Sequence, residues 1–210
     1  MSDLKMKRNE ISINHFKKNN VDFFFSRKME WKESDIVLHE ADIDRYSKIH
    51  NSDRKNEFLG VRNLRNQYNS RLEIKYLSNG KPVIENSSEH ISISHSKNYV
   101  AFAVAPYKIG IDIEEIHERI LKVNGRFLNQ RELELFNLNS LADLTVAWCA
   151  KETLFKLNDN SGLDFKTDLI IKNWDKNSTI FAEMKQNSQW VNVNLHFEIK
   201  DNLVLCFNFE

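Results

Sequence analysis

Two carboxylates, Asp112 and Glu114, alternate with isoleucines in residues 109–114. Successive side chains of a strand point to opposite faces, so both carboxylates project from one face, about 6.6 Å apart along the strand. Their oxygens suit Mg²⁺, which commonly takes one or two carboxylates together with phosphate oxygens. A strand with one solvated face explains the same pattern, because Asp-x-Glu is common in sequences. The pair indicates metal-assisted chemistry on a phosphate only if other residues support it.

A second group of residues that could take part in a reaction lies in residues 143–157, where the apolar spacing predicts a helix. Trp148, Glu152 and Lys156 follow one another at intervals of four and therefore form one stripe. The simplest explanation is a Glu-Lys pair on a solvated face. Lys151 does not fit it, because a lysine among apolar neighbours must reach solvent or meet an anion, of which phosphate is one candidate.

Residues that could bind phosphate also precede the carboxylate pair. His95 ends an alternating segment between two serines, and Lys81 lies in a predicted tight turn. Arg54, Arg62 and Arg65 share one stripe of a predicted helix, and arginine forks suit phosphate oxygens. Considered alone, the arginines are better explained as surface charges, because charged residues on exposed faces need no ligand.

Helices and antiparallel hairpins are predicted to position these residues. Spacings of three and four predict helices at 40–50, 52–68 with a cap at Ser52, 129–136 and 143–157. Alternation and apolar runs predict strands at 21–25, 91–95, 99–105, 109–114, 180–182, 190–199 and 203–209. This mixture is typical of the α+β class.

Composition narrows the classes of function. Thirty basic and thirty acidic residues give a formal net charge of zero, so no overall positive field attracts nucleic acid. The longest apolar run, 100–105, is too short to span a bilayer, and residues 1–8 have charge but no apolar stretch behind them. Cys149 and Cys206 form no Cys-x-x-Cys pair and are expected to be free thiols. We expect a cytoplasmic protein without nucleic-acid or membrane partners.

Five short motifs occur in a defined order along the chain. They are Gly80-Lys81-Pro82, Ile93-Ser94-His95-Ser96, Gly110-Ile111-Asp112-Ile113-Glu114, Arg126-Phe127-Leu128 with Glu132, and Trp148-Cys149-Ala150-Lys151-Glu152 with Lys156. Together they resemble the 4′-phosphopantetheinyl transferase superfamily, in the longer monomeric form that activates peptide and polyketide synthetases. The resemblance covers roughly residues 54–165. Each motif alone is weak, but their order makes the match specific.

The resemblance implies a fold of two similar α+β halves related by a pseudo-twofold axis, with antiparallel sheets, packed helices and coenzyme A in the cleft between the halves. We place the join at Pro106, so the expected halves are residues 1–106 and 107–210, the second carrying the metal site. A chain that contains both halves is expected to be a monomer.

The implied reaction transfers the 4′-phosphopantetheine arm of coenzyme A to a serine of an acyl or peptidyl carrier protein and releases 3′,5′-adenosine bisphosphate. By resemblance, Asp112 and Glu114 bind Mg²⁺, and Glu152 either completes the metal shell or acts as the general base. Glu152 is expected to be ionised at neutral pH, because a metal and a lysine nearby lower the pKa of a carboxyl group.

Basic residues are implied to bind coenzyme A, and Lys156 also belongs to the catalytic pair with Glu152. The implied contacts are to the pyrophosphate from Lys151 and Lys156, to the coenzyme A phosphates from His95 and Lys81, and to the 3′-phosphate region from Arg54 or Arg62.

Two other classes of function remain open. One is a non-catalytic module of the same fold that binds coenzyme A or a carrier protein, and the other is a Mg²⁺-dependent phosphotransferase or nuclease. The clustered carboxylates and lysines argue against the first, and the neutral net charge argues against a nucleic-acid substrate. Neither alternative predicts a covalent change to a carrier protein.

Overall fold

The structure is a computed structural model that describes residues 13–85, 87–159 and 162–210. Residues 1–8, on which the expected lack of a secretion signal rests, lie outside the described residues. Within the described ranges, five α-helices and one short 3₁₀ helix connect the strands of three antiparallel sheets. The predicted α+β class is therefore confirmed.

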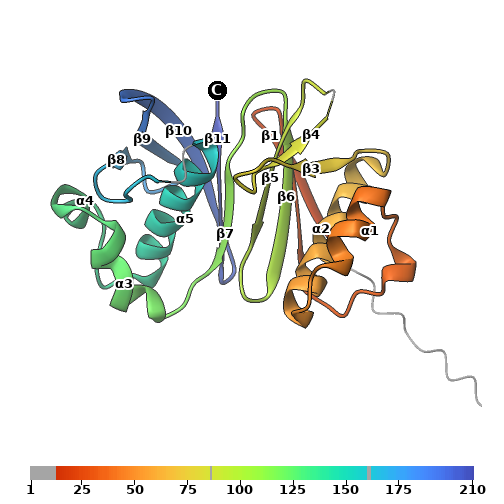
Figure 1. Cartoon of the computed structure of the whole chain (residues 1–210). Coiled ribbons are helices and arrows are strands. Elements are labelled where there is room, and N and C mark those ends of the chain that lie inside the picture. The colour runs from red at the N-terminus through yellow and green to blue at the C-terminus, as the bar shows by residue number, and fades with distance from the viewer. Residues whose placement is uncertain (1–12, 86, 160–161) are drawn as a thin grey trace, which may run out of the picture.

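The strands before residue 106 form a four-stranded sheet in the order β1-β2-β6-β5 and a separate β3-β4 pair. Two α-helices lie between β2 and β3 along the chain (Figure 1). The elements are β1 (Ile13–Lys18), β2 (Val21–Arg27), the 3₁₀ helix η1 (Glu33–Asp35), α1 (Glu40–Ser47), α2 (Ser52–Asn69), β3 (Ile74–Tyr76), β4 (Pro82–Ile84), β5 (His90–His95) and β6 (Tyr99–Ala105).

The strands after residue 106 form a five-stranded sheet in the order β7-β11-β10-β9-β8. Three helices follow β7 and precede β8. The elements are β7 (Ile111–Glu115), α3 (Arg119–Phe127), α4 (Gln130–Leu135), α5 (Leu141–Leu157), β8 (Leu169–Trp174), β9 (Thr179–Gln186), β10 (Gln189–Lys200) and β11 (Leu203–Phe209).

The two large sheets stand against each other in the middle of the molecule, with α1 and α2 outside one and α3, α4 and α5 outside the other (Figure 1). Side chains of β6 alternate between the core shared by the sheets (Ala101, Ala103, Ala105) and the core beneath α2 (Val100, Phe102, Val104). Strand β11 alternates in the same way between the shared core and the core beneath α5. The period of two along these strands thus builds a helix–sheet–sheet–helix arrangement.

Gly110, just before β7, lets α5 approach that strand closely. A Cβ atom at this position would lie 2.4 Å from the carbonyl oxygen of Thr153 and 2.9 Å from the amide nitrogen of Leu157. Both are backbone atoms of α5, which cannot move aside as the end of a side chain can. Glycine here therefore permits the short distance between β7 and the helix that carries Glu152.

Replacing Gly110 with alanine is expected to destabilise the fold by about 1–3 kcal/mol, as overpacking generally does. The matched control is Gly125→Ala in α3, where an added Cβ meets no atom within 4 Å. That change is expected to stabilise the protein by about 0.4–1 kcal/mol, because alanine restricts the unfolded chain and favours a helix. Urea unfolding of both variants measures the difference; equal effects would contradict the close approach.

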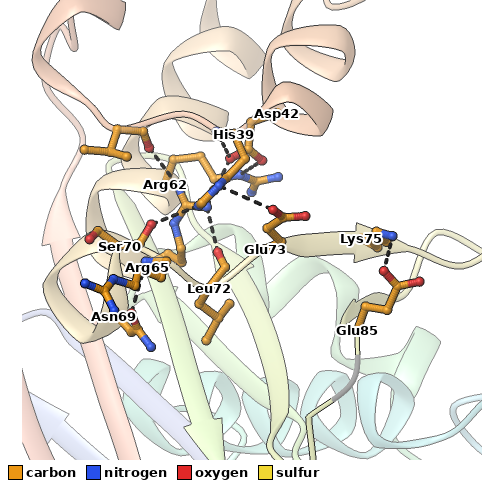
Figure 2. A network of polar contacts seen from close by, with 12 residues as sticks. His39, Asp42, Arg62, Arg65, Asn69, Ser70, Leu72, Glu73, Lys75 and Glu85 are labelled. Carbon is orange, nitrogen blue, oxygen red and sulfur yellow. Dashed lines mark hydrogen bonds and ion pairs between the residues drawn. The ribbon is translucent and has the colours of Figure 1, made fainter.

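Arg62 and Arg65 are not surface charges, and this part of the sequence interpretation is wrong. Both side chains are buried and share the carboxylate of Asp42, which accepts from Arg62 Nε at 2.6 Å and from Arg65 Nη1 at 3.1 Å (Figure 2). Arg65 also donates to the carbonyl of Leu72 at 2.8 Å. The arginines therefore join α2 to α1 and to the loop before β3.

Cys149 and Cys206 are both buried and free, as the sequence predicted. No helix in the described ranges combines the length and apolarity needed to cross a bilayer.

Candidate active site

Helix α5 places its predicted stripe beside β7. Its first turn is capped by Ser140, whose Oγ accepts from the amide of Asp143 at 3.2 Å. Further along, Trp148 Nε1 donates to Glu114 Oε1 at 3.0 Å. The stripe therefore faces the carboxylate pair rather than solvent, so the simple explanation of a solvated Glu-Lys pair is wrong.

Asp112 is the point where β5, β7 and α5 meet. Its side chain is buried, and its Oδ1 accepts from Lys156 Nζ and from Ser94 Oγ, each at 2.7 Å. Lys156 Nζ is also 2.7 Å from Ser94 Oγ. The other oxygen, Oδ2, is buried and has no hydrogen-bond partner in the part of the chain that the structure describes. A buried anionic oxygen without a partner is costly unless a cation or donor meets it.

The two other carboxylates of the site titrate near neutrality. Burial, followed by the charge of Asp112, raises the pKa of Glu114 to about 7, against the hydrogen bond from Trp148. The same two causes raise the pKa of Glu152 to about 7, against the attraction of Lys156. Without a metal ion, desolvation of Glu152 thus outweighs the attraction of Lys156, and the expected ionised form of Glu152 depends on a cation nearby.

Among the described residues, no group of three or more His, Cys, Asp or Glu side chains is arranged to hold a metal ion. The chemistry of the donors nevertheless fits Mg²⁺. Asp112 offers a buried oxygen without a partner, and the charge on Asp112 disfavours ionisation of Glu114 and Glu152. A divalent cation relieves that repulsion, and hard carboxylate oxygens are its preferred protein ligands.

Lys151 lies on the other side of α5, and its placement contradicts the assignment to pyrophosphate. Its side chain is fully buried, and its Nζ pairs with Glu132 Oε1 at 2.6 Å. Nζ also donates to the carbonyl of Phe165 at 2.7 Å and to that of Leu169. Burial lowers the pKa of Lys151, and Glu132 opposes that effect. All three ammonium donors thus have partners inside the protein.

Three of the predicted basic residues line one cavity of about 520 Å³ beside α2, namely Arg54, Arg62 and His95. Arg54 is exposed, whereas Arg62 is buried and contacts Asp42 and the hydroxyl of Tyr76. Arg62 Nη2 has no hydrogen-bond partner among the described residues. Burial lowers the pKa of His95, and the nearby carboxylate of Glu57 opposes this. The cationic side chains that line the cavity thus include Arg54 and Arg62, and Arg62 has a donor that no described residue uses.

Lys81 and Lys156 line a smaller cavity of about 220 Å³ on the other side of β5. Lys81 follows the predicted tight turn, in which Gly80 has a φ of 84°. Its Nζ donates at 2.7 Å to Asp159, which also accepts from Lys108 at 2.6 Å. The sequence reasoning did not find Asp159, because only the fold brings it beside two lysines that are distant in the chain.

The largest of these cavities, about 720 Å³, lies between β7, α3 and α5 and was not predicted. Glu114 and Trp148 line it together with the apolar face of α3, which comprises Ile120, Val123 and Phe127. The spacing of these three residues is a helical signal that would have identified both α3 and its inner face.

The C-terminal part of the chain has recognisable relatives. Residues 108–207 match the family model of the 4′-phosphopantetheinyl transferase superfamily. That match contains the Asp112 and Glu152 motifs and extends through the C-terminal strands, which the motifs did not reach. The family resemblance is therefore confirmed for this part of the chain.

Two curated relatives carry the same activity in their names. The chain is 30% identical to 4′-phosphopantetheinyl transferase gsp of Aneurinibacillus migulanus over 115 residues, which is 52% of this chain and 46% of the relative. It is 38% identical to 4′-phosphopantetheinyl transferase psf-1 of Bacillus pumilus over 85 residues, or 38% of this chain and 36% of the relative. The matches thus span less than half of each relative's length.

Proposed function

We propose that this protein transfers the 4′-phosphopantetheine arm of coenzyme A to a serine of an acyl or peptidyl carrier protein. The observation that carries the proposal is the set of Glu114, Glu152 and Lys156 around Asp112, at the place where both halves of the fold meet. Glu114 lines one cavity and Lys156 a second, while a third cavity is lined by Arg54, Arg62 and His95. The matched family and the names of both relatives support the same reaction.

The proposed architecture has two halves, 1–106 and 107–210, related by a pseudo-twofold axis. In each half the strand before the helices pairs with the last strand, as β2 does with β6 and β7 with β11. On its other side, the last strand of each half pairs with the strand that precedes it in the chain, β5 in one half and β10 in the other. This repeated order supports the axis and the join at Pro106. We also propose that the protein is a cytoplasmic monomer. The two free cysteines favour the cytoplasm, because thiols stay reduced there.

We assign the coenzyme A contacts to residues that line the cavities. Arg54 and Arg62 are suited to the 3′-phosphate, while His95 and Lys81 are suited to the remaining phosphates. Lys156 stands at Asp112 and would balance charge on the pyrophosphate. Mg²⁺ held by Asp112 and Glu114 would supply positive charge for the same phosphates.

The proposed chemistry forms a bond between the carrier serine oxygen and the β-phosphorus of coenzyme A. The bond from that phosphorus to the bridging oxygen of the pyrophosphate breaks, and 3′,5′-adenosine bisphosphate leaves. The serine proton must be accepted, and Glu152 is suited to do so because its carboxylate lies beside Asp112 and Lys156 in the candidate site. Lys156 stabilises the charge that develops on the phosphoryl oxygens.

The test is the intact mass of an apo acyl carrier protein after incubation with this protein, coenzyme A and Mg²⁺. A gain of one phosphopantetheine arm, absent when Mg²⁺ is chelated, is the expected result. Unchanged mass across several carrier proteins, with coenzyme A still bound, would replace the proposal with a non-catalytic binding module.

Arg54→Ala is expected to raise the KM for coenzyme A about tenfold, because a charged hydrogen bond to the 3′-phosphate is lost. With dephospho-coenzyme A, which lacks that phosphate, the variant and the wild type should have the same KM. Arg71→Ala is the control, since Arg71 is exposed and lines a different surface cavity. A tenfold effect that persists with dephospho-coenzyme A would contradict the assignment.

A further inference from the structure

Glu115 occupies an unusual position at the end of β7. The alternation of the strand sends Ile111 and Ile113 into the core between the two sheets. Glu115 is the next residue on that face, and it is partly buried. An acidic side chain that continues an apolar face needs polar partners.

Those partners all belong to the turn between β5 and β6. The carboxylate of Glu115 accepts from the amide of Asn98 at 2.9 Å, from Asn98 Nδ2 at 2.7 Å and from Ser96 Oγ at 3.2 Å. Hydrogen bonds to an ionised acceptor are stronger than those between neutral groups. The carbonyl of Asn98 accepts from the amide of Lys28, at the end of β2, at 2.6 Å. The turn is thus held by both halves of the protein.

This turn separates two of the cavities around the candidate active site. His95, just before the turn, lines the cavity of about 520 Å³ that also contains Arg54. Lys97 and Asn98, within the turn, line the cavity of about 720 Å³ that also contains Glu114. A ligand that reaches from one cavity to the other must pass the turn.

We infer that Glu115 is a positioning residue that fixes the turn at 96–98, so that His95 and Lys97 face a substrate lying across both cavities. The inference rests on the proposed transfer from coenzyme A. Glu115 acts through the turn and contacts no reacting atom. Removal of Glu115 leaves the Ser94–Asp112 hydrogen bond intact, so β5 stays attached to β7 while its turn loosens.

Glu115→Ala is expected to lower kcat/KM for coenzyme A about tenfold, chiefly by raising KM, because the turn no longer holds its binding groups in place. Glu115→Gln keeps an acceptor for the Asn98 amide and should recover most of the activity. Glu118→Ala is the matched control, since Glu118 is exposed and lies three residues further along the chain. In the His95→Ala background, the effect of Glu115→Ala should be smaller than in the wild type, because only Lys97 then still depends on the turn.

Amide hydrogen exchange reports on the turn independently of activity. The Asn98 amide should exchange at least tenfold faster in Glu115→Ala than in the wild type and in Glu118→Ala. Unchanged exchange, unchanged kcat/KM, or full additivity with His95→Ala would each overturn the inference while wild-type transfer persists. Absence of transfer by the wild type would instead overturn the proposed function, and the inference with it.

Discussion

Asp112→Ala is expected to reduce modification of a carrier protein by about 10²–10³-fold, the usual cost of losing a group that organises transition-state charge. The carboxylate holds Lys156 and Ser94 in place at 2.7 Å and leaves a second, buried oxygen without a partner among the described residues. Its loss removes the proposed Mg²⁺ ligand and the anchor of Lys156 together. The readout is the fraction of carrier with increased mass against time.

Asp44→Ala provides the control, because Asp44 is exposed and its pair with Lys48 lies on the surface. A second variant, Asp112→Asn, keeps the shape of the side chain but lacks the negative charge. We expect it to be as inactive as Asp112→Ala while unfolding near the wild-type temperature. An Asp112→Asn protein with wild-type transfer would exclude Asp112 as a metal ligand.

The local part of the site was predictable because it depends on periodicity. Alternation places Asp112 and Glu114 on one face of a strand, and the interval of four residues places Glu152 and Lys156 on one face of a helix. The fold brings these two faces together. Lys151 shows the limit of such reasoning. Its apolar neighbours indicated that it must reach solvent or meet an anion, and the anion that it meets is Glu132 within the protein and not a phosphate.

Long-range pairing also explains the error over the arginines. Arg62 and Arg65 look like a surface stripe, because their acceptor, Asp42, belongs to a different helix and periodicity along α2 cannot reveal it. The cap of α2 is likewise Asn51, whose side chain accepts from the Arg54 amide, and not the predicted Ser52. Two residues of similar capping propensity stand side by side there, so sequence alone does not choose between them.

Strands were predicted where both faces are buried or where apolar and polar residues alternate. The bounds of β6 and β11 agree with the predicted ones. Strand β1 was missed because its side chains are mostly exposed or half-buried. The Asn19-Asn20 dipeptide was the available signal, since both residues have positive φ in the turn to β2. A turn of this kind predicts a strand on each side.

Lys151→Met is expected to destabilise the protein by about 3–5 kcal/mol, because it leaves the carboxylate of Glu132 buried without its cation. Glu132 cannot turn away, since its oxygens also accept from the amides of Asn129 at 2.8 Å and Ile171 at 2.7 Å. For a chain of this length, such a loss lowers the unfolding temperature by about 10 °C. Calorimetry or thermal unfolding followed by circular dichroism measures it.

Lys172→Met is the matched control, because it breaks a surface pair with Glu183 that is expected to contribute less than about 1 kcal/mol. The double variant Lys151→Met/Glu132→Gln should recover part of the stability, since its buried amide carries no unpaired charge. Recovery would show that the charge of Glu132 causes the loss. If Lys151→Met unfolds at the temperature of Lys172→Met, the buried pair does not hold α5 against α4 and β8.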